Sequence, residues 1–183
     1  RHLAAIAAQH QKYRDAEVFL QQAVKVSPDY ARAWLELSVA QLNDDKLEEA
    51  IESARRVAEL APDSAEAHLA LGNAQARADW PAQAAESYRA ALDIVPEHAG
   101  AFSGLGQQLK TIGRQEEAIE VYRQSIKCDP TNAEPYWSLA NMKTFRFDDS
   151  DLGVMQEMLE SQEISDQSAV QFCNALGFAY ESR

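Results

Sequence analysis

The sequence predicts an all-α fold, a solenoid in which antiparallel helix pairs stack into a superhelix. Prolines recur at one fixed interval of 34 residues, at Pro28, Pro62, Pro96 and Pro130. Within each interval, apolar and small residues return at spacings of three and four, which is the periodicity of α-helices and not of strands. A short polar segment divides each interval into two such runs. A repeat of this length indicates one helical unit stacked on copies of itself.

Laying the intervals 31–64, 65–98, 99–132 and 133 onward over one another brings residues of one kind into the same position. A ring side chain is followed three residues later by a leucine and then at once by a small residue. The members in chain order are Trp34, His68, Phe102 and Tyr136 for the ring, Leu37, Leu71, Leu105 and Leu139 for the leucine, and Ser38, Gly72, Gly106 and Ala140 for the small residue. Because antiparallel helices approach closely only where a side chain is nearly absent, the small position predicts where the helices of a pair touch.

The clearest interval also shows where its helices begin and end. We predict helices over residues 31–42 and 46–60, with a polar turn at 43–45 between them. The proline of each interval ends the second helix, and Pro81 fits the first turn of its own helix, where a missing N–H costs nothing. The residues expected to cap the helix that follows are Asp29, Asp63 and Thr131.

The second helices share a pattern as well, and the combined pattern resembles a known family. The recurring positions there are Ala50, Ala84 and Ala118, followed by Ala54, Tyr88 and Tyr122. Together with the first-helix positions and the four prolines, they resemble the tetratricopeptide repeat over about residues 1–145. The resemblance implies a right-handed array of helix pairs that binds proteins or peptides on its concave side.

The repeat frame predicts one array over residues 1–183. It divides into a partial repeat at 1–30, full repeats at 31–64, 65–98 and 99–132, an irregular repeat at 133–161 and a truncated repeat at 166–183. Terminal repeats normally carry a polar cap. Neither end of this sequence has one, so we expect the chain to be a fragment of a longer protein.

The irregular repeat carries a second, narrower resemblance. The phrase from Trp137 to Phe147, the acidic helix after it, and the helix at 175–181 are similar to bacterial proteins in which tetratricopeptide repeats precede a sulfotransferase domain. This resemblance implies a catalytic domain beyond residue 183, to which the repeats would bring the acceptor substrate. The sequence itself has no strand followed by a Gly-rich phosphate loop. The chain is therefore predicted not to be an enzyme and to need no cofactor.

Composition narrows the class of partner. The formal net charge is −12 and no basic cluster interrupts it. Nucleic acid is a poor partner for such a surface, because binding would require Lys and Arg to neutralise phosphates. No apolar run is long enough to span a membrane.

Cys128 and Cys173 make no disulfide framework and are expected to be small hydrophobes in a reduced, cytoplasmic protein. His2, His10 and His98 share no helix face with a cysteine, and His68 takes the ring position of the repeat, so no metal site is expected.

The concave side, lined by first helices, remains as the candidate site. One position there holds Val39 and then three amides in successive repeats, and an amide side chain can both donate to and accept from a peptide backbone. Two basic residues and an aromatic anchor accompany them. The predicted groove residues are Asn73, Arg77, Gln107, Lys110, Trp137 and Asn141.

Several alternatives to peptide binding stay open at this point. One is that the groove side chains do no more than line a wet surface. Self-association through the exposed apolar ends is another reading. A chaperone-tail adaptor is disfavoured, because the Lys, Asn and Arg of the two-carboxylate clamp found in some tetratricopeptide domains are replaced here by apolar or small residues. The sequence therefore predicts a protein or an extended peptide as partner, without specifying which.

Overall fold

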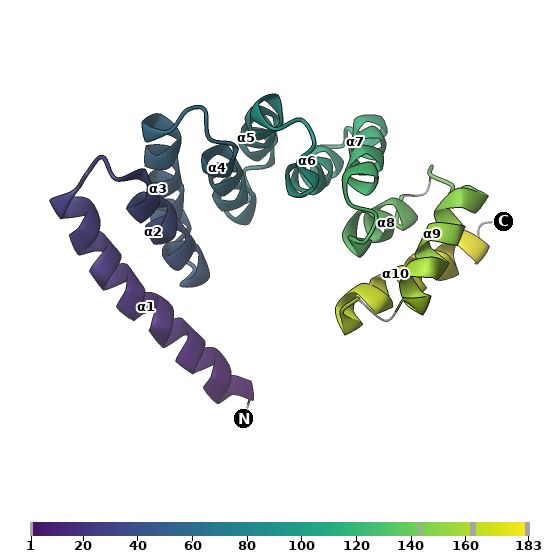
Figure 1. Cartoon of the computed structure of the whole chain (residues 1–183), viewed down its shortest axis with the longest axis horizontal. Coiled ribbons are helices and arrows are strands. Elements are labelled where there is room, and N and C mark those ends of the chain that lie inside the picture. The colour runs from purple at the N-terminus through teal and green to yellow at the C-terminus, as the bar shows by residue number, and fades with distance from the viewer. Residues whose placement is uncertain (1, 143, 162–163, 182–183) are drawn as a thin grey trace. The chain divides into compact units, whose positions relative to one another are not determined.

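The computed structural model describes residues 2–142, 144–161 and 164–181, and these residues form ten α-helices and no strand (Figure 1). The predicted all-α fold of antiparallel helix pairs is confirmed. The chain divides into two compact units, Arg1–Pro96 and Glu97–Arg183. The first unit contains α1 (His2–Val26), α2 (Ala31–Asn43), α3 (Leu47–Leu60), α4 (Ala65–Arg77) and α5 (Pro81–Ile94). The second contains α6 (Ala99–Thr111), α7 (Gln115–Cys128), α8 (Ala133–Ala140), α9 (Asp149–Glu160) and α10 (Asp166–Glu181).

The turn inside each helix pair depends on one residue with left-handed backbone. Asp45 has φ 61°, Asp79 has φ 58° and Gly113 has φ 85°. Glycine and the short polar residues tolerate this region best. One interval earlier the same position holds Gln11, and there the chain does not turn but continues as the single helix α1. The partial repeat expected at 1–30 is thus one long helix instead of a helix pair.

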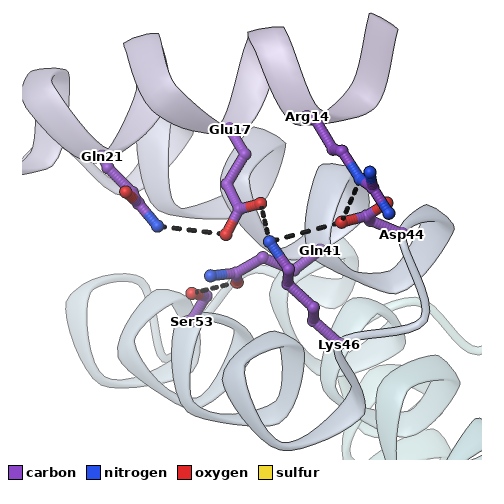
Figure 2. A network of polar contacts seen from close by, with 7 residues as sticks. All are labelled: Arg14, Glu17, Gln21, Gln41, Asp44, Lys46 and Ser53. Carbon is purple, nitrogen blue, oxygen red and sulfur yellow. Dashed lines mark hydrogen bonds and ion pairs between the residues drawn. The ribbon is translucent and has the colours of Figure 1, made fainter. Parts of the chain in front are cut away.

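Helix α1 is fastened to the α2–α3 turn by a network of charged groups (Figure 2). Lys46 Nζ donates to the buried Glu17 carboxylate, whose other oxygen accepts from Gln21 Nε2 at 3.0 Å. Asp44 accepts from Arg14 Nε at 3.0 Å and lies 3.3 Å from Lys46 Nζ. Beside this network, Val24 packs in a cluster with residues of α2. Polar and apolar contacts together hold the second half of α1 in place.

The small position of the repeat lies against a tyrosine ring. A Cβ added at Gly72 would come within 2.9 Å of the Tyr88 ring, and one added at Gly106 within 2.7 Å of the Tyr122 ring. Both rings are almost fully buried. The predicted close approach is confirmed, and its physical reason is the ring that fills the space above each glycine.

The second unit departs from the repeat after α8, which is only 8 residues long. Helix α10 packs directly against α8, while α9 packs against α10. The cluster between them includes Tyr136 and Met155, and the ring of Phe172 lies 5.3 Å from that of Tyr136. Arg123 of α7 joins this group, because it donates to the buried Asp151 at 2.6 Å and lies 4.8 Å above the Phe145 ring.

Two local expectations were wrong. Ser64 caps α4 and Asn132 caps α8, each one residue after the predicted Asp63 and Thr131, and α2, for which Asp29 was predicted, has no side-chain cap. His98 caps α6, for which no cap was predicted. Cys173 is exposed, and its neighbour Phe172 takes the buried place. Cys128 is half-buried, and burial raises the pKa of its thiol. Pro81 does stand in the first turn of α5, as predicted.

Candidate binding surfaces

The first unit has a pocket of about 520 Å³ between α1, α2 and α4. Its walls are mostly aliphatic. The lining side chains include Ala16 and Leu20 from α1, Leu35, Val39 and Leu42 from α2, and Leu69, Ala70 and Asn73 from α4. Charged residues Arg32, Glu36 and Glu66 stand at the same pocket. Burial of an apolar side chain is the chemistry that such a surface offers.

Two predicted groove residues lie in this unit. Asn73 lines the pocket and is exposed, and its Oδ1 accepts a hydrogen bond from the Tyr88 hydroxyl at 2.8 Å. Arg77 lines a smaller depression beside it, and its Nη2 lies 3.2 Å from an oxygen of Asp45. Both side chains therefore already have partners within the chain.

The second unit has a pocket of about 700 Å³ between α6, α8 and α10. Its lining is polar instead of aliphatic. It brings together the four other predicted residues, Gln107, Lys110, Trp137 and Asn141, with Asn132, Glu134, Ser138, Ser165, Gln167, Ser168 and Gln171. Amides and hydroxyls both donate and accept, so this surface suits the polar backbone of an extended chain.

Internal contacts hold the orientation of these side chains. Gln107 Oε1 accepts from the Tyr122 hydroxyl at 3.1 Å, which repeats the contact between Tyr88 and Asn73 one interval earlier. Asn141 Nδ2 donates to the backbone oxygen of Trp137 at 2.8 Å. The Trp137 ring packs 5.9 Å from the ring of Phe178, so part of this predicted anchor is used within the unit.

Sequence reasoning missed two contributors to these surfaces. The first is the serine and glutamine side chains of α10 and the residue before it, which lie beyond an irregular joint where the repeat gives no position. The second is the apolar character of the first pocket. A signal for it was present, since Val39 stands where later repeats have an amide and Ala54 stands where they have tyrosine.

Metal-binding groups and titratable side chains are the features that would indicate catalysis at these surfaces. Among the described residues, no group of three or more His, Cys, Asp or Glu side chains is arranged to hold a metal ion. Burial raises the pKa of Tyr122 and of Tyr136 to about 12. These phenols stay protonated near neutral pH and serve packing and hydrogen bonding. Of the helices described, none combines the length and apolar character needed to cross a membrane.

Two segments of the chain match models of known protein families. Residues 7–77 match the family model of the tetratricopeptide repeat, and residues 106–142 match a further model described as TPR repeat. Among the curated proteins the sequence has no significant match.

Solved structures share the fold. MamA has a TM-score of 0.69 at 22% identity, with 96% of this chain and 93% of MamA covered. A thermophilic TPR protein of Thermus thermophilus has a TM-score of 0.69 at 18% identity, with 96% of each chain covered. YrrB, described as a TPR protein with an unusual peptide-binding site, has a TM-score of 0.64 at 14% identity, with 97% of this chain and 83% of YrrB covered. The two matched segments, one in each unit, therefore consist of tetratricopeptide repeats.

Proposed function

We propose that this chain is a non-catalytic scaffold that binds a segment of a protein partner on the faces of its first helices. The observation that carries the proposal is the pocket of the second unit, where Gln107, Lys110, Trp137 and Asn141 line one polar surface. The pocket of the first unit, with Asn73 on its wall, supplies a second contact surface. The peptide-binding site ascribed to YrrB, which shares the fold, supports the same class of function.

The test must separate ligand contact from internal packing, because two of the amides accept hydrogen bonds from tyrosine hydroxyls. Alanine would leave those hydroxyls without an acceptor. The variant N73D/Q107E/N141D instead keeps an oxygen for each tyrosine and removes the amide N–H donors. A matched control is Q22E/Q83E/Q124E, which makes the same charge change at exposed positions outside both pockets.

Peptides selected from a displayed random library on the full chain serve as probes, with affinity measured by titration calorimetry. Each hydrogen bond contributes about 0.5–1.5 kcal/mol, so we expect the groove variant to bind at least about tenfold more weakly than the control. Asn141→Asp also removes the hydrogen bond to the Trp137 backbone oxygen, so the double variant N73D/Q107E, which keeps both tyrosine acceptors, is measured beside the triple variant. Thermal unfolding of this double variant should match that of the control. Equal affinities would remove the amides from the binding surface.

A second proposal is that the chain recruits substrate for a sulfotransferase domain beyond residue 183. The resemblance of the phrase from Trp137 to Phe147 to proteins of that class supports it. Within this phrase, Phe145 and Phe147 meet edge to face at 4.9 Å, and Phe145 also lies beneath Arg123. Sequencing the parent gene past the codon for Arg183 tests this reading. A strand followed by a Gly-rich phosphate loop would support it, and further repeats ending in a stop codon would exclude it.

The remaining assignments of partner and location are proposals of the same kind. The net charge of −12 supports a protein partner over nucleic acid. Both cysteines are free, which fits a bacterial cytoplasmic protein.

Exposed apolar side chains such as Phe19 and Val170 favour self-association. Light scattering over a concentration series tests that last proposal, and a constant mass would contradict it.

A further inference from the structure

One repeat of the first unit differs from its neighbours at two positions that touch each other. In the later repeats a tyrosine of the second helix donates its hydroxyl hydrogen to a first-helix amide, Tyr88 to Asn73 and Tyr122 to Gln107. In α2 and α3 the same positions hold Val39 and Ala54. Because both members are replaced together, no buried hydroxyl is left without an acceptor. The exchange turns a polar stretch of the first-helix face into an apolar one.

The altered position forms part of the pocket wall. Val39 is 47% exposed although it is aliphatic, and it lines the pocket with Leu35 and Leu69. The pocket volume of about 520 Å³ falls in the range that binding sites for small groups occupy. An exposed valine in such a pocket offers a surface on which another apolar group can be buried.

The charges at the pocket are not balanced. Arg32 Nε donates to Glu36 Oε1 at 2.9 Å, and its Nη1 lies 3.8 Å from Glu66 Oε1. Two carboxylates thus share one guanidinium. The hydrogen bond to Glu36, followed by the attraction of both carboxylates, raises the pKa of Arg32 and keeps it charged. The rim therefore has an excess of negative charge, within a chain whose net charge is −12.

From these features we infer that the pocket of the first unit is a side-chain subsite, which takes an aliphatic residue flanked by Lys or Arg on a segment of the partner protein. The inference rests on the proposed function and narrows it to a partner of defined chemistry. The apolar walls bind the aliphatic side chain. Glu36 and Glu66 attract the flanking positive charges.

Four synthetic peptides provide the probes. Each has a Gly-Ser-Gly segment at either end and a variable centre, which is Lys-Leu-Lys, Lys-Ala-Lys, Glu-Leu-Glu or Glu-Ala-Glu. Each peptide is titrated into the full chain, and the amide signals of Leu35, Val39 and Leu69 are followed by NMR. Since about 0.8 kcal/mol accompanies each buried CH₂, we expect the Lys-Leu-Lys peptide to bind at least about tenfold more tightly than Lys-Ala-Lys. We expect Glu-Leu-Glu to bind more weakly than Lys-Leu-Lys, with the difference shrinking as salt is added.

Two variants test the two parts of the inference separately. The triple variant S38G/V39N/A54Y rebuilds in α2 and α3 the glycine, amide and tyrosine of the next repeat. It should bind the leucine peptides about tenfold more weakly, because the wall becomes polar. The single variant V39N gives the same direction of change if the triple variant folds poorly. The variant E36Q/E66Q should abolish the preference for lysine-flanked peptides, whereas E48Q/E49Q, at exposed positions of α3 outside the pocket lining, should retain it.

The outcomes distinguish this inference from the proposed function. Saturating shifts confined to the pocket of the first unit, with the expected order of peptides, support the inference. Equal binding of all four peptides would overturn it. Library-selected peptides that respond to N73D/Q107E/N141D but not to V39N would also overturn it, while leaving the proposed function in place. Failure of the chain to bind any selected peptide would overturn both.

Discussion

The two units present surfaces of opposite chemistry on first helices that share one repeat frame. The pocket of the first unit is walled by leucine, valine and alanine, while that of the second is lined by amides and hydroxyls. The difference does not come from the backbone, since α2, α4 and α6 are all 13 residues long and are followed by turns with one left-handed residue each. It comes from the side chains: in the first unit one amide–tyrosine pair is replaced by Val39 and Ala54, and in the second the serines and glutamines of α10 and the residue before it add to the polar lining.

Paired replacement explains how the surface changes while the packing is retained. In the first of these repeats, Val39 and Ala54 occupy the positions that hold an amide and a tyrosine in the next two repeats. A second pair lies deeper, where Gln41 accepts from Ser53 at 2.7 Å in one repeat, and Leu109 stands with Val121 two repeats later. In each case a hydrogen-bonded pair is exchanged for an apolar pair as a unit. In these repeats neither exchange leaves half of a buried polar contact, which is the costly arrangement.

The largest effect is expected where a glycine meets a tyrosine ring. Gly106→Ala places a Cβ within 2.7 Å of the buried Tyr122 ring, and overpacking of this kind costs about 1–3 kcal/mol. The gain in helix propensity is at most about 1 kcal/mol, so the variant should be less stable. Gly177→Ala in α10 is the matched control, because nothing described lies within 4 Å of the added Cβ. It should be stabilised by about 0.5–1 kcal/mol. Denaturant unfolding checks both, and a stabilised Gly106→Ala would contradict the packing of this glycine against the ring.

The position of Gly177 also shows how far the sequence could predict the fold. Leu176 and Gly177 repeat the leucine–glycine step of α4 and α6, and that step predicts the helix. The structure has α10 packed against α8, with no ring above Gly177 among the described residues. The repeat period fixes which residues are alike, but after the irregular joint it no longer says which helices are neighbours.

For the helix caps and the site residues too, the sequence predicts some features and misses others. Two of the predicted caps missed by one residue, because Asp63 stands beside Ser64 and Thr131 beside Asn132, and each of these residue types can cap a helix. The period predicts the amide position, and the structure brings Gln107 and Asn141 to one pocket. It does not predict the tyrosine contacts that hold Asn73 and Gln107. Those contacts link two helices, whereas the repeat pattern describes one helix at a time.

A smaller and pH-dependent effect is expected in the charged network of the first unit. Burial alone would raise the pKa of Asp44, but hydrogen bonds from Arg14 and Lys46 outweigh it and lower the pKa below its usual value. A lowered pKa means that Asp44 contributes stability above its ordinary pKa, and that this contribution is lost as pH falls through the lowered value. Asp44→Asn should therefore be less stable than the parent at neutral pH, with a gap that closes in acid.

The control for this prediction is Asp93→Asn, an exposed change of the same charge on α5. Unfolding midpoints measured from neutral pH down to about pH 2 should show the closing gap for Asp44→Asn alone. A gap that stays constant with pH would mean that the charge of Asp44 is not what fastens α1. In the second unit, the buried carboxylate of Asp151 differs from that of Asp44 in its partners. It accepts one hydrogen bond from Arg123 and one from the backbone N–H of Asp148, the latter as part of a capping box.

The smallest effect should come from exchanging a whole pair. Gln41→Leu with Ser53→Val gives the first unit the apolar pair that the later repeat has at Leu109 and Val121. Because both partners of the hydrogen bond are removed together, the double variant should lie within about 1 kcal/mol of the parent. Gln41→Leu alone leaves the buried Ser53 hydroxyl without its acceptor and should cost about 1–3 kcal/mol. A double-mutant cycle by denaturant unfolding measures the coupling between the two positions. If the double variant lost as much stability as the two single variants added together, the positions would be independent, and paired replacement would not be what lets these repeats change their surface.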